Sequence, residues 1–134
     1  CRHGPRHTKT HGADYAAGVI YSREDFIQKN PQTVQAVVNA MVRALRWIQK
    51  ATPEQIVAVV PPEYYGENKA MYRVALGKNF NAISPDGAMS MAAAQNVYSV
   101  LKTFEPSVQQ AEGKIDLART FDNRFVVEAL KKYK

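Results

Sequence analysis

The chain has 134 residues, of which 46% are hydrophobic and 10% aromatic, and 18 basic against 12 acidic side chains give a formal net charge of +6. A chain of this length buries roughly two thirds of its unfolded surface on folding, and its hydrophobic content excludes a wholly disordered protein. The single cysteine, Cys1, excludes an internal disulfide framework and a thiolate zinc site. No apolar run approaches the roughly 18 residues of a membrane span.

The positive charge is concentrated at the start of the chain. Residues 1–12 contain Arg2, Arg6 and Lys9, no acid and all three histidines. We therefore divide the chain into a basic segment, 1–12, expected to be disordered or non-native, and one folded unit, 13–134. The charge balance of the second part is ordinary, which argues against a nucleic-acid partner. No signal-peptide pattern is present, and we expect the chain to be a fragment or a processed product.

Residues 14–21 predict one short strand. The sequence Asp-Tyr-Ala-Ala-Gly-Val-Ile-Tyr is apolar and rich in residues that favour strands. Everything after it has the pattern of helices. Ser22 followed by Asp25 predicts a capped helix that runs to about Lys29.

The best predicted helix begins at Asn30-Pro31, an N-cap residue followed by the residue best tolerated at the first helical position. Its expected apolar face recurs every three or four residues, and basic side chains lie on the opposite face. The expected apolar residues are Val34, Val37, Val38, Met41, Leu45 and Ile48, and the polar face holds Gln35, Asn39, Arg43, Arg46 and Lys50.

Three further helix starts follow. Thr52-Pro53-Glu54-Gln55 predicts a capping box and a helix of two turns that ends before Pro61-Pro62. Ser84-Pro85-Asp86-Gly87 predicts another start, for a helix that Pro106 ends. A last helix is expected after Asp122. Between them, a weaker helical stripe passes through Met71, Tyr72, Ala75, Leu76 and Phe80.

Catalytic and metal-binding patterns are weak. His3, His7 and His11 have a spacing that could hold zinc, nickel or copper on a helix, but Gly4 and Pro5 argue against a helix there, so we expect no physiological metal site. The acidic residues stand mostly at helix starts or in linkers, and no glycine-rich phosphate loop or serine elbow is present. We expect no catalytic residues, no cofactor and no enzymatic activity.

The segment 12–18 is the best candidate for ligand contact. Its small residues let backbone amides approach a ligand, and Tyr15 offers an aromatic ring with a hydroxyl. The alternative is a strand that enters a sheet, with small residues required for packing. The residues alone leave both interpretations open.

From Asp14 onward, the chain resembles the C-terminal part of periplasmic substrate-binding proteins of ABC transporters in the nitrate/sulfonate/taurine group, including relatives that bind thiamine-pyrimidine precursors. The resemblance covers all but the first dozen residues, and the order and spacing of its segments carry it. The segments are 15–27, Lys29-Asn30-Pro31, 33–36, 43–48, Thr52-Pro53-Glu54, Ile83-Ser84-Pro85-Asp86-Gly87, Ile115-Asp116-Leu117 and 120–126.

The resemblance implies an α/β fold of the two-lobed periplasmic binding protein type II, of which this chain is a mostly α fragment with one short strand near its N-terminus. It implies an extracytoplasmic solute-binding component of an ABC importer, here truncated and lacking the first lobe. Its partners are then a small solute, such as an anion, and an ABC permease. Asp14, Tyr15 and Ala16 are carried over as ligand-binding residues.

Two rival functions remain. The first is a small helical interaction module that binds another protein or a nucleic acid through Arg43, Arg46 and Lys50, in which case binding should depend steeply on salt. The second is enzymatic, since some relatives of the fold participate in making thiamine pyrimidine. We rank the enzyme last because residues 13–134 contain no histidine.

Overall fold

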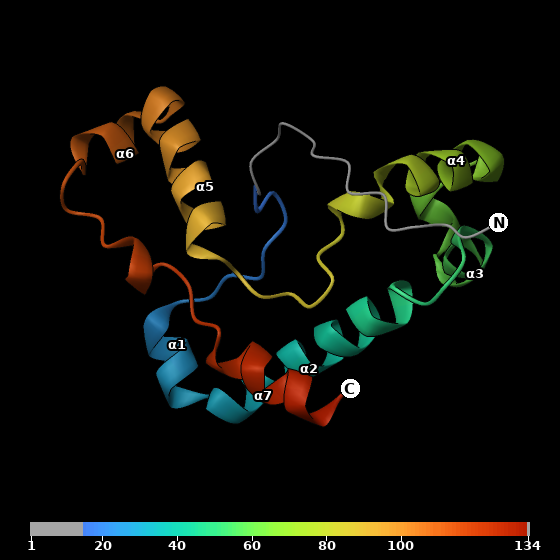
Figure 1. Cartoon of the computed structure of the whole chain (residues 1–134), viewed down its shortest axis with the longest axis horizontal. Coiled ribbons are helices and arrows are strands. Elements are labelled where there is room, and N and C mark those ends of the chain that lie inside the picture. Colours follow the sequence, from blue (N-terminus) through green and yellow to red (C-terminus); the bar gives the residue numbers. More distant parts are fainter. Residues whose placement is uncertain (1–14, 134) are drawn as a thin grey trace, which may run out of the picture. The chain divides into compact units, whose positions relative to one another are not determined.

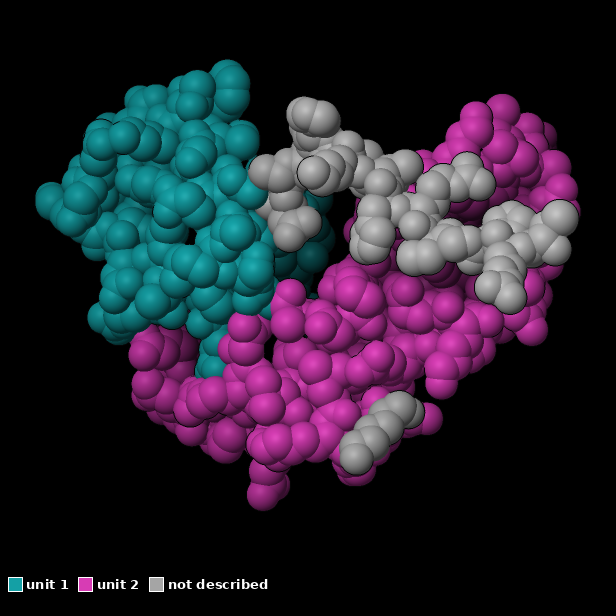
Figure 2. Space-filling model, in the orientation of Figure 1, with its two compact units in different colours: residues 1–21, 89–122 teal, residues 22–88, 123–134 magenta. Residues whose placement is uncertain are grey.

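The computed structural model describes residues 15–133, and in that part of the chain all regular structure is helical (Figure 1). The contacts between elements fall into two compact units, which Figure 2 shows in different colours. The described residues of unit 1 are 15–21 and 89–122, and those of unit 2 are 22–88 and 123–133. No helix within the described residues is long and apolar enough to cross a membrane.

The predicted strand is wrong for the residues that the structure describes. Residues 15–23 are irregular: the Ala17 N–H donates to the Tyr15 carbonyl at 3.0 Å, and the Arg23 carbonyl accepts from the Phe26 and Ile27 N–H groups at the start of the next helix. A strand requires a partner with which to exchange hydrogen bonds, and no described segment supplies one. The apolar residues that favoured a strand, Val19 and Ile20, are instead 55% and 58% exposed.

The α/β, two-lobed fold class is likewise a wrong prediction. Between residues 15 and 133 the structure contains helices and no sheet, so the described chain is all-helical. The expectation of a mostly α chain agrees with this, whereas the strand and the α/β class do not. The helical signals came from the residues themselves, but the α/β class came from the resemblance.

Unit 2 is built around α2 (Pro31–Ile48), which packs against α7 (Arg124–Lys132) and follows the short α1 (Glu24–Lys29). Asn30 and Pro31 begin α2 where the sequence predicts it. The buried centre of this pair is Val42, Val126 and Ala129, which are at most 9% exposed. Gln35 joins the helices by donating from its side-chain amide to the Phe125 carbonyl at 2.9 Å.

The buried face of α2 differs from the predicted one. Val42, absent from the predicted apolar face, is 1% exposed, while Val37 and Met41 are 45% and 44% exposed. Val38 and Val42 are one helical turn apart and both belong to the cluster that α7 completes, so the face covered by α7 is rotated around α2 from the predicted face.

The remaining elements of unit 2 are α3 (Pro53–Val59) and α4 (Lys69–Asn79), which pack together, and two short 3-10 helices, η1 (Pro62–Tyr64) and η2 (Phe80–Ala82). The capping box of α3 is confirmed, because the Gln55 N–H donates to Thr52 Oγ1 and the Thr52 N–H to Gln55 Oε1. Ile56 and Val57 supply the buried face of α3.

Unit 1 contains α5 (Met91–Phe104), α6 (Pro106–Gln110) and the 3-10 helix η3 (Leu117–Arg119). The predicted start of α5 at Ser84 is wrong. Ser84 Oγ accepts from the Gly87 N–H in a local turn, and the helix begins seven residues later with Ser90 as its cap, whose Oγ accepts from the Ala93 N–H at 3.0 Å. Gly87 has a φ of 81°, which no helix accommodates.

Candidate functional site

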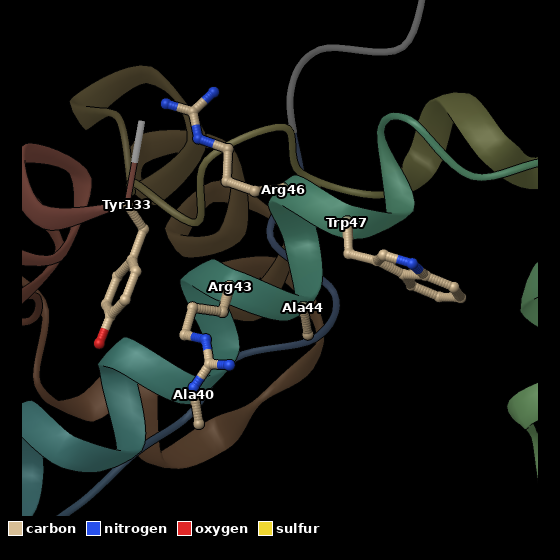
Figure 3. A pocket seen from close by; sticks show the side chains of 6 residues that line it. All are labelled: Ala40, Arg43, Ala44, Arg46, Trp47 and Tyr133. Carbon is tan, nitrogen blue, oxygen red and sulfur yellow. The ribbon is translucent and has the colours of Figure 1, made fainter.

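A groove lies beside α2 in unit 2, and we call it the basic groove. It has a volume of about 550 Å³ and is open to solvent. Its lining residues come from the second half of α2 and from the residue after α7, and Figure 3 shows all of them: Ala40, Arg43, Ala44, Arg46, Trp47 and Tyr133.

The helical repeat explains why these residues share a groove. Ala40 and Ala44 are one turn apart, so their small side chains leave a shallow hollow along the helix. Arg43 and Arg46 are three residues apart and are therefore neighbours on the helix surface. In Figure 3 the Arg46 side chain points up from α2, the Arg43 guanidinium points down toward Ala40, and the Trp47 ring extends away from Tyr133.

Two cationic side chains lie close to the Tyr133 ring. The Arg43 guanidinium carbon lies 5.6 Å from the ring centre, and Lys132 Nζ lies 5.4 Å from it. Both distances are within the range of cation–π attraction. A guanidinium that packs on a ring keeps the N–H groups at its edge free to donate to an anion.

Arg46 contributes an unsatisfied donor. Its Nε is buried and has no hydrogen-bond partner, although the residue as a whole is only partly buried. A buried polar atom without a partner costs free energy, which a bound acceptor would recover. Within residues 15–133, no carboxylate forms an ion pair with Arg43, Arg46 or Lys132.

The helix dipole offers a separate explanation for a basic residue near the end of α2. Arg46 lies in the last turn of α2, where the helix dipole favours a cation. The dipole does not account for the stacked Tyr133 or for the unpartnered Nε of Arg46. Together these features describe a surface that attracts an anion.

A second, smaller hollow in unit 2, of about 350 Å³, lies between α1, α2 and α7. It contains both signs of charge, since Arg124 and Glu128 both line it. The amide of Gln35, which also lines it, is already bonded to Phe125 and Asn39. This hollow therefore has less selectivity for an anion than the basic groove.

The predicted ligand-binding residues lie elsewhere. Asp14 is outside the described residues, as are His3, His7 and His11. Tyr15 is 48% exposed and Ala16 is partly buried, both in the irregular segment of unit 1. Their role stays a prediction. Among the described residues, no three His, Cys, Asp or Glu side chains are grouped as a metal site requires.

Sequence reasoning identified Arg43 and Arg46 as one basic face but missed the rest of the groove. Lys50, predicted on the same face, does not line it. Ala40 and Ala44 lie at the helical spacing of the two arginines, so a search for small residues beside them could have found them. Tyr133 had no such signal because it is distant in the sequence.

Comparison with known proteins gives one informative match. The chain is similar to a protein of Bordetella bronchiseptica RB50 whose structure has been solved, with 36% sequence identity over 84% of this chain and a TM-score of 0.77. It spans only 35% of the length of that protein. No family model matches the chain, and no curated protein matches it.

Proposed function

We propose that this chain is part of a longer, extracytoplasmic, non-enzymatic protein that binds a small solute for an ABC importer. The observation that carries the proposal is the ordered series of segments between Asp14 and Val126 that resembles the nitrate/sulfonate/taurine group. The proposal concerns the role of the protein in transport and does not include the two-lobed α/β fold.

Two further observations support the proposal. The chain resembles about a third of the Bordetella protein over most of its own length, as a part of a longer protein would. Several large apolar side chains are also exposed, among them Val37, Met41 and Trp47 on α2. Apolar surface of this kind is often covered by another part of a protein or by a partner.

Within this proposal, Asp14, Tyr15 and Ala16 contact the solute, and an ABC permease receives it. Tyr15 is 48% exposed, so a solute can reach it. An anionic solute fits the net charge of +6, because a positive protein attracts anions.

Uptake in the source organism tests the proposal. Deletion of the coding region should abolish uptake of one labelled solute class among nitrate, taurine, alkanesulfonates and pyrimidine precursors of thiamine. Tyr15→Ala in the native gene should weaken uptake, whereas Tyr64→Ala, which removes an exposed tyrosine of η1, should not. Unchanged uptake of all four classes after deletion would overturn the proposal. Steeply salt-dependent binding to a protein or a nucleic acid would then favour an interaction module.

A further inference from the structure

We infer that α2 packs against another part of the longer protein to which this chain belongs, through a surface that we call the apolar face of α2. The inference rests on the proposed function only in taking this chain as one portion of a longer protein, and it does not depend on the role in transport. The face consists of five exposed residues: Val37, Ala40, Met41, Ala44 and Trp47.

The five residues form one continuous face. They recur at intervals of three and four residues, which places them on one side of the helix. Val37, Met41 and Trp47 are 45%, 44% and 43% exposed. The neighbouring side of α2, which includes Val38 and Val42, belongs to the cluster that α7 covers. The contact with α7 therefore leaves the apolar face of α2 open.

The composition of the face suits packing against another element. Residues 31–42 include no charged side chain, and Ala40 and Ala44 project from α2 on the side opposite to Arg46 (Figure 3). Small alanine side chains let a neighbouring element approach closely, while methionine and tryptophan are enriched where protein surfaces meet. Large contiguous apolar patches are rarely left in water by monomeric proteins. The face therefore has the composition of a surface that is buried in the complete protein.

The rest of the longer protein is the occupant that the observations favour. The chain spans only 35% of the Bordetella protein, whereas 84% of this chain matches it with a TM-score of 0.77. Most of that protein thus lies outside the region that this chain resembles. A segment that the backbone joins to this chain is present at a high effective concentration, which favours its binding over that of a separate molecule.

Charge argues against a second copy of this chain as the occupant. Arg43 follows Ala40 by three residues and precedes Trp47 by four, so it borders the apolar face of α2. Residues 31–50 contain two further bases, Arg46 and Lys50, and no acid. Two copies that packed through this face would bring like charges together, which disfavours the complex.

Oxidative footprinting of the native protein tests the inference. Hydroxyl radicals oxidise exposed methionine and aromatic side chains, and peptide mass spectrometry gives a rate for each residue. We expect Met41 and Trp47 to be oxidised several-fold more slowly in the protein purified from the source organism than in the 134-residue chain, because packing excludes the radicals. Tyr64 of η1, which is 69% exposed and lies outside the face, is the control and should be oxidised equally in both.

A charge placed in the face gives a second measurement. Met41→Glu in the native protein should lower the thermal midpoint, Tm, by several degrees, because a carboxylate would be buried without a partner. The same substitution in the 134-residue chain should change the Tm little, since Met41 is exposed there. Val127→Glu is the matched control, because Val127 is an exposed valine of α7 with Arg124 and Lys131 within one turn of it. It should change the Tm little in both proteins.

Four results would overturn the inference. The first is oxidation of Met41 and Trp47 at equal rates in the two proteins, or a slowing that Tyr64 shares equally. The second is an unchanged Tm of the native protein with Met41→Glu. The third is a dimer of the 134-residue chain, detected by light scattering, in which Met41 and Trp47 are protected, because the occupant would then be a second copy. The fourth is a native product of 134 residues. In each case the uptake measurements still decide the role in transport.

Discussion

At the residue scale, position 87 requires a glycine, both because of its backbone conformation and because a Cβ there would lie too close to a neighbouring side chain. Its φ is 81°, a value that residues with a Cβ rarely adopt, and a Cβ placed there would lie 3.1 Å from Leu45 Cδ1. We expect Gly87→Ala to lower the free energy of unfolding by about 1 kcal/mol or more. Chemical denaturation followed by circular dichroism would measure the change.

Gly77 provides the control for this prediction. It lies inside α4, and a Cβ placed on it would meet nothing within 4 Å. Gly77→Ala should therefore raise the free energy of unfolding by about 0.5–1 kcal/mol, because alanine favours a helix over glycine. A Gly87→Ala protein as stable as the parent would contradict the strain assigned to this turn.

Lys102 and Glu112 form an ion pair in unit 1. The hydrogen bond to Glu112, and then its negative charge, raise the pKa of Lys102 above its ordinary value. A lysine whose pKa is raised by folding stabilises the folded state. This stabilisation is fully present below the pKa of the unfolded state and is lost as the pH rises through the pKa of the folded state. Glu112→Gln should thus lower the pKa of Lys102, with little effect on stability at neutral pH because both groups are exposed.

Nuclear magnetic resonance titration of the lysine side chains measures this pKa. Glu128→Gln removes the partner of Lys131 in unit 2 and should leave the pKa of Lys102 unchanged. If Lys102 titrates identically in the parent and in Glu112→Gln, the ion pair does not form in solution.

At the scale of elements, Thr52 caps α3 through a reciprocal pair of hydrogen bonds with Gln55. Thr52→Ala should lower the free energy of unfolding by about 1 kcal/mol, since an orphan amide at the helix start loses its acceptor. Urea denaturation would measure the loss. Ser22→Ala is the comparison, because α1 begins at Glu24 without a side-chain cap, and it should change stability by less than about 0.5 kcal/mol. Equal losses in both variants would show that Thr52 does not act as a cap.

The capping signals show how far sequence predicts elements. Thr52, Ser22 and Ser84 all precede residues suited to a helix start, yet only Thr52 caps as predicted. Ser84 Oγ accepts a hydrogen bond from the Gly87 N–H within a local turn, and α5 begins only after Ser90, whose Oγ accepts from the Ala93 N–H. The sequence pattern identifies a side-chain oxygen that could accept a hydrogen bond at a helix start. Tertiary packing determines where the helix begins and therefore which backbone N–H groups lack a partner. Helix α2, which has a long amphipathic pattern, begins where the sequence predicts it, although its buried face differs from the predicted one.

At the scale of the whole molecule, Val42 connects the two helices that form the core of unit 2. Val42→Ala should lower the free energy of unfolding by about 2 kcal/mol, through the lost methyl groups and the cavity left between α2 and α7. Val37→Ala, in the same helix but 45% exposed, should cost well under half as much. Denaturation of both variants in urea, followed by circular dichroism, tests the difference. Equal losses would place the core elsewhere on α2.

The basic groove illustrates the limit of sequence reasoning at this scale. Arg43 and Arg46 could be assigned to one helix face because their spacing is local. Tyr133 could not be assigned, because its position depends on the packing of α7 against α2 and no local pattern encodes that contact. The strand predicted at 14–21 is absent from residues 15–21, the part that the structure describes, for a related reason, since a strand depends on a partner that a single segment does not reveal.

The pairing of α2 with α7 has a consequence for biosynthesis. Gln35 and Phe125 are 90 residues apart in the sequence, so the contact that buries Val42 closes a long loop. During translation, α2 leaves the ribosome long before α7 is made, and its apolar side stays uncovered for most of that time. A chaperone that holds nascent apolar segments would therefore meet α2 first, and release would follow the emergence of α7.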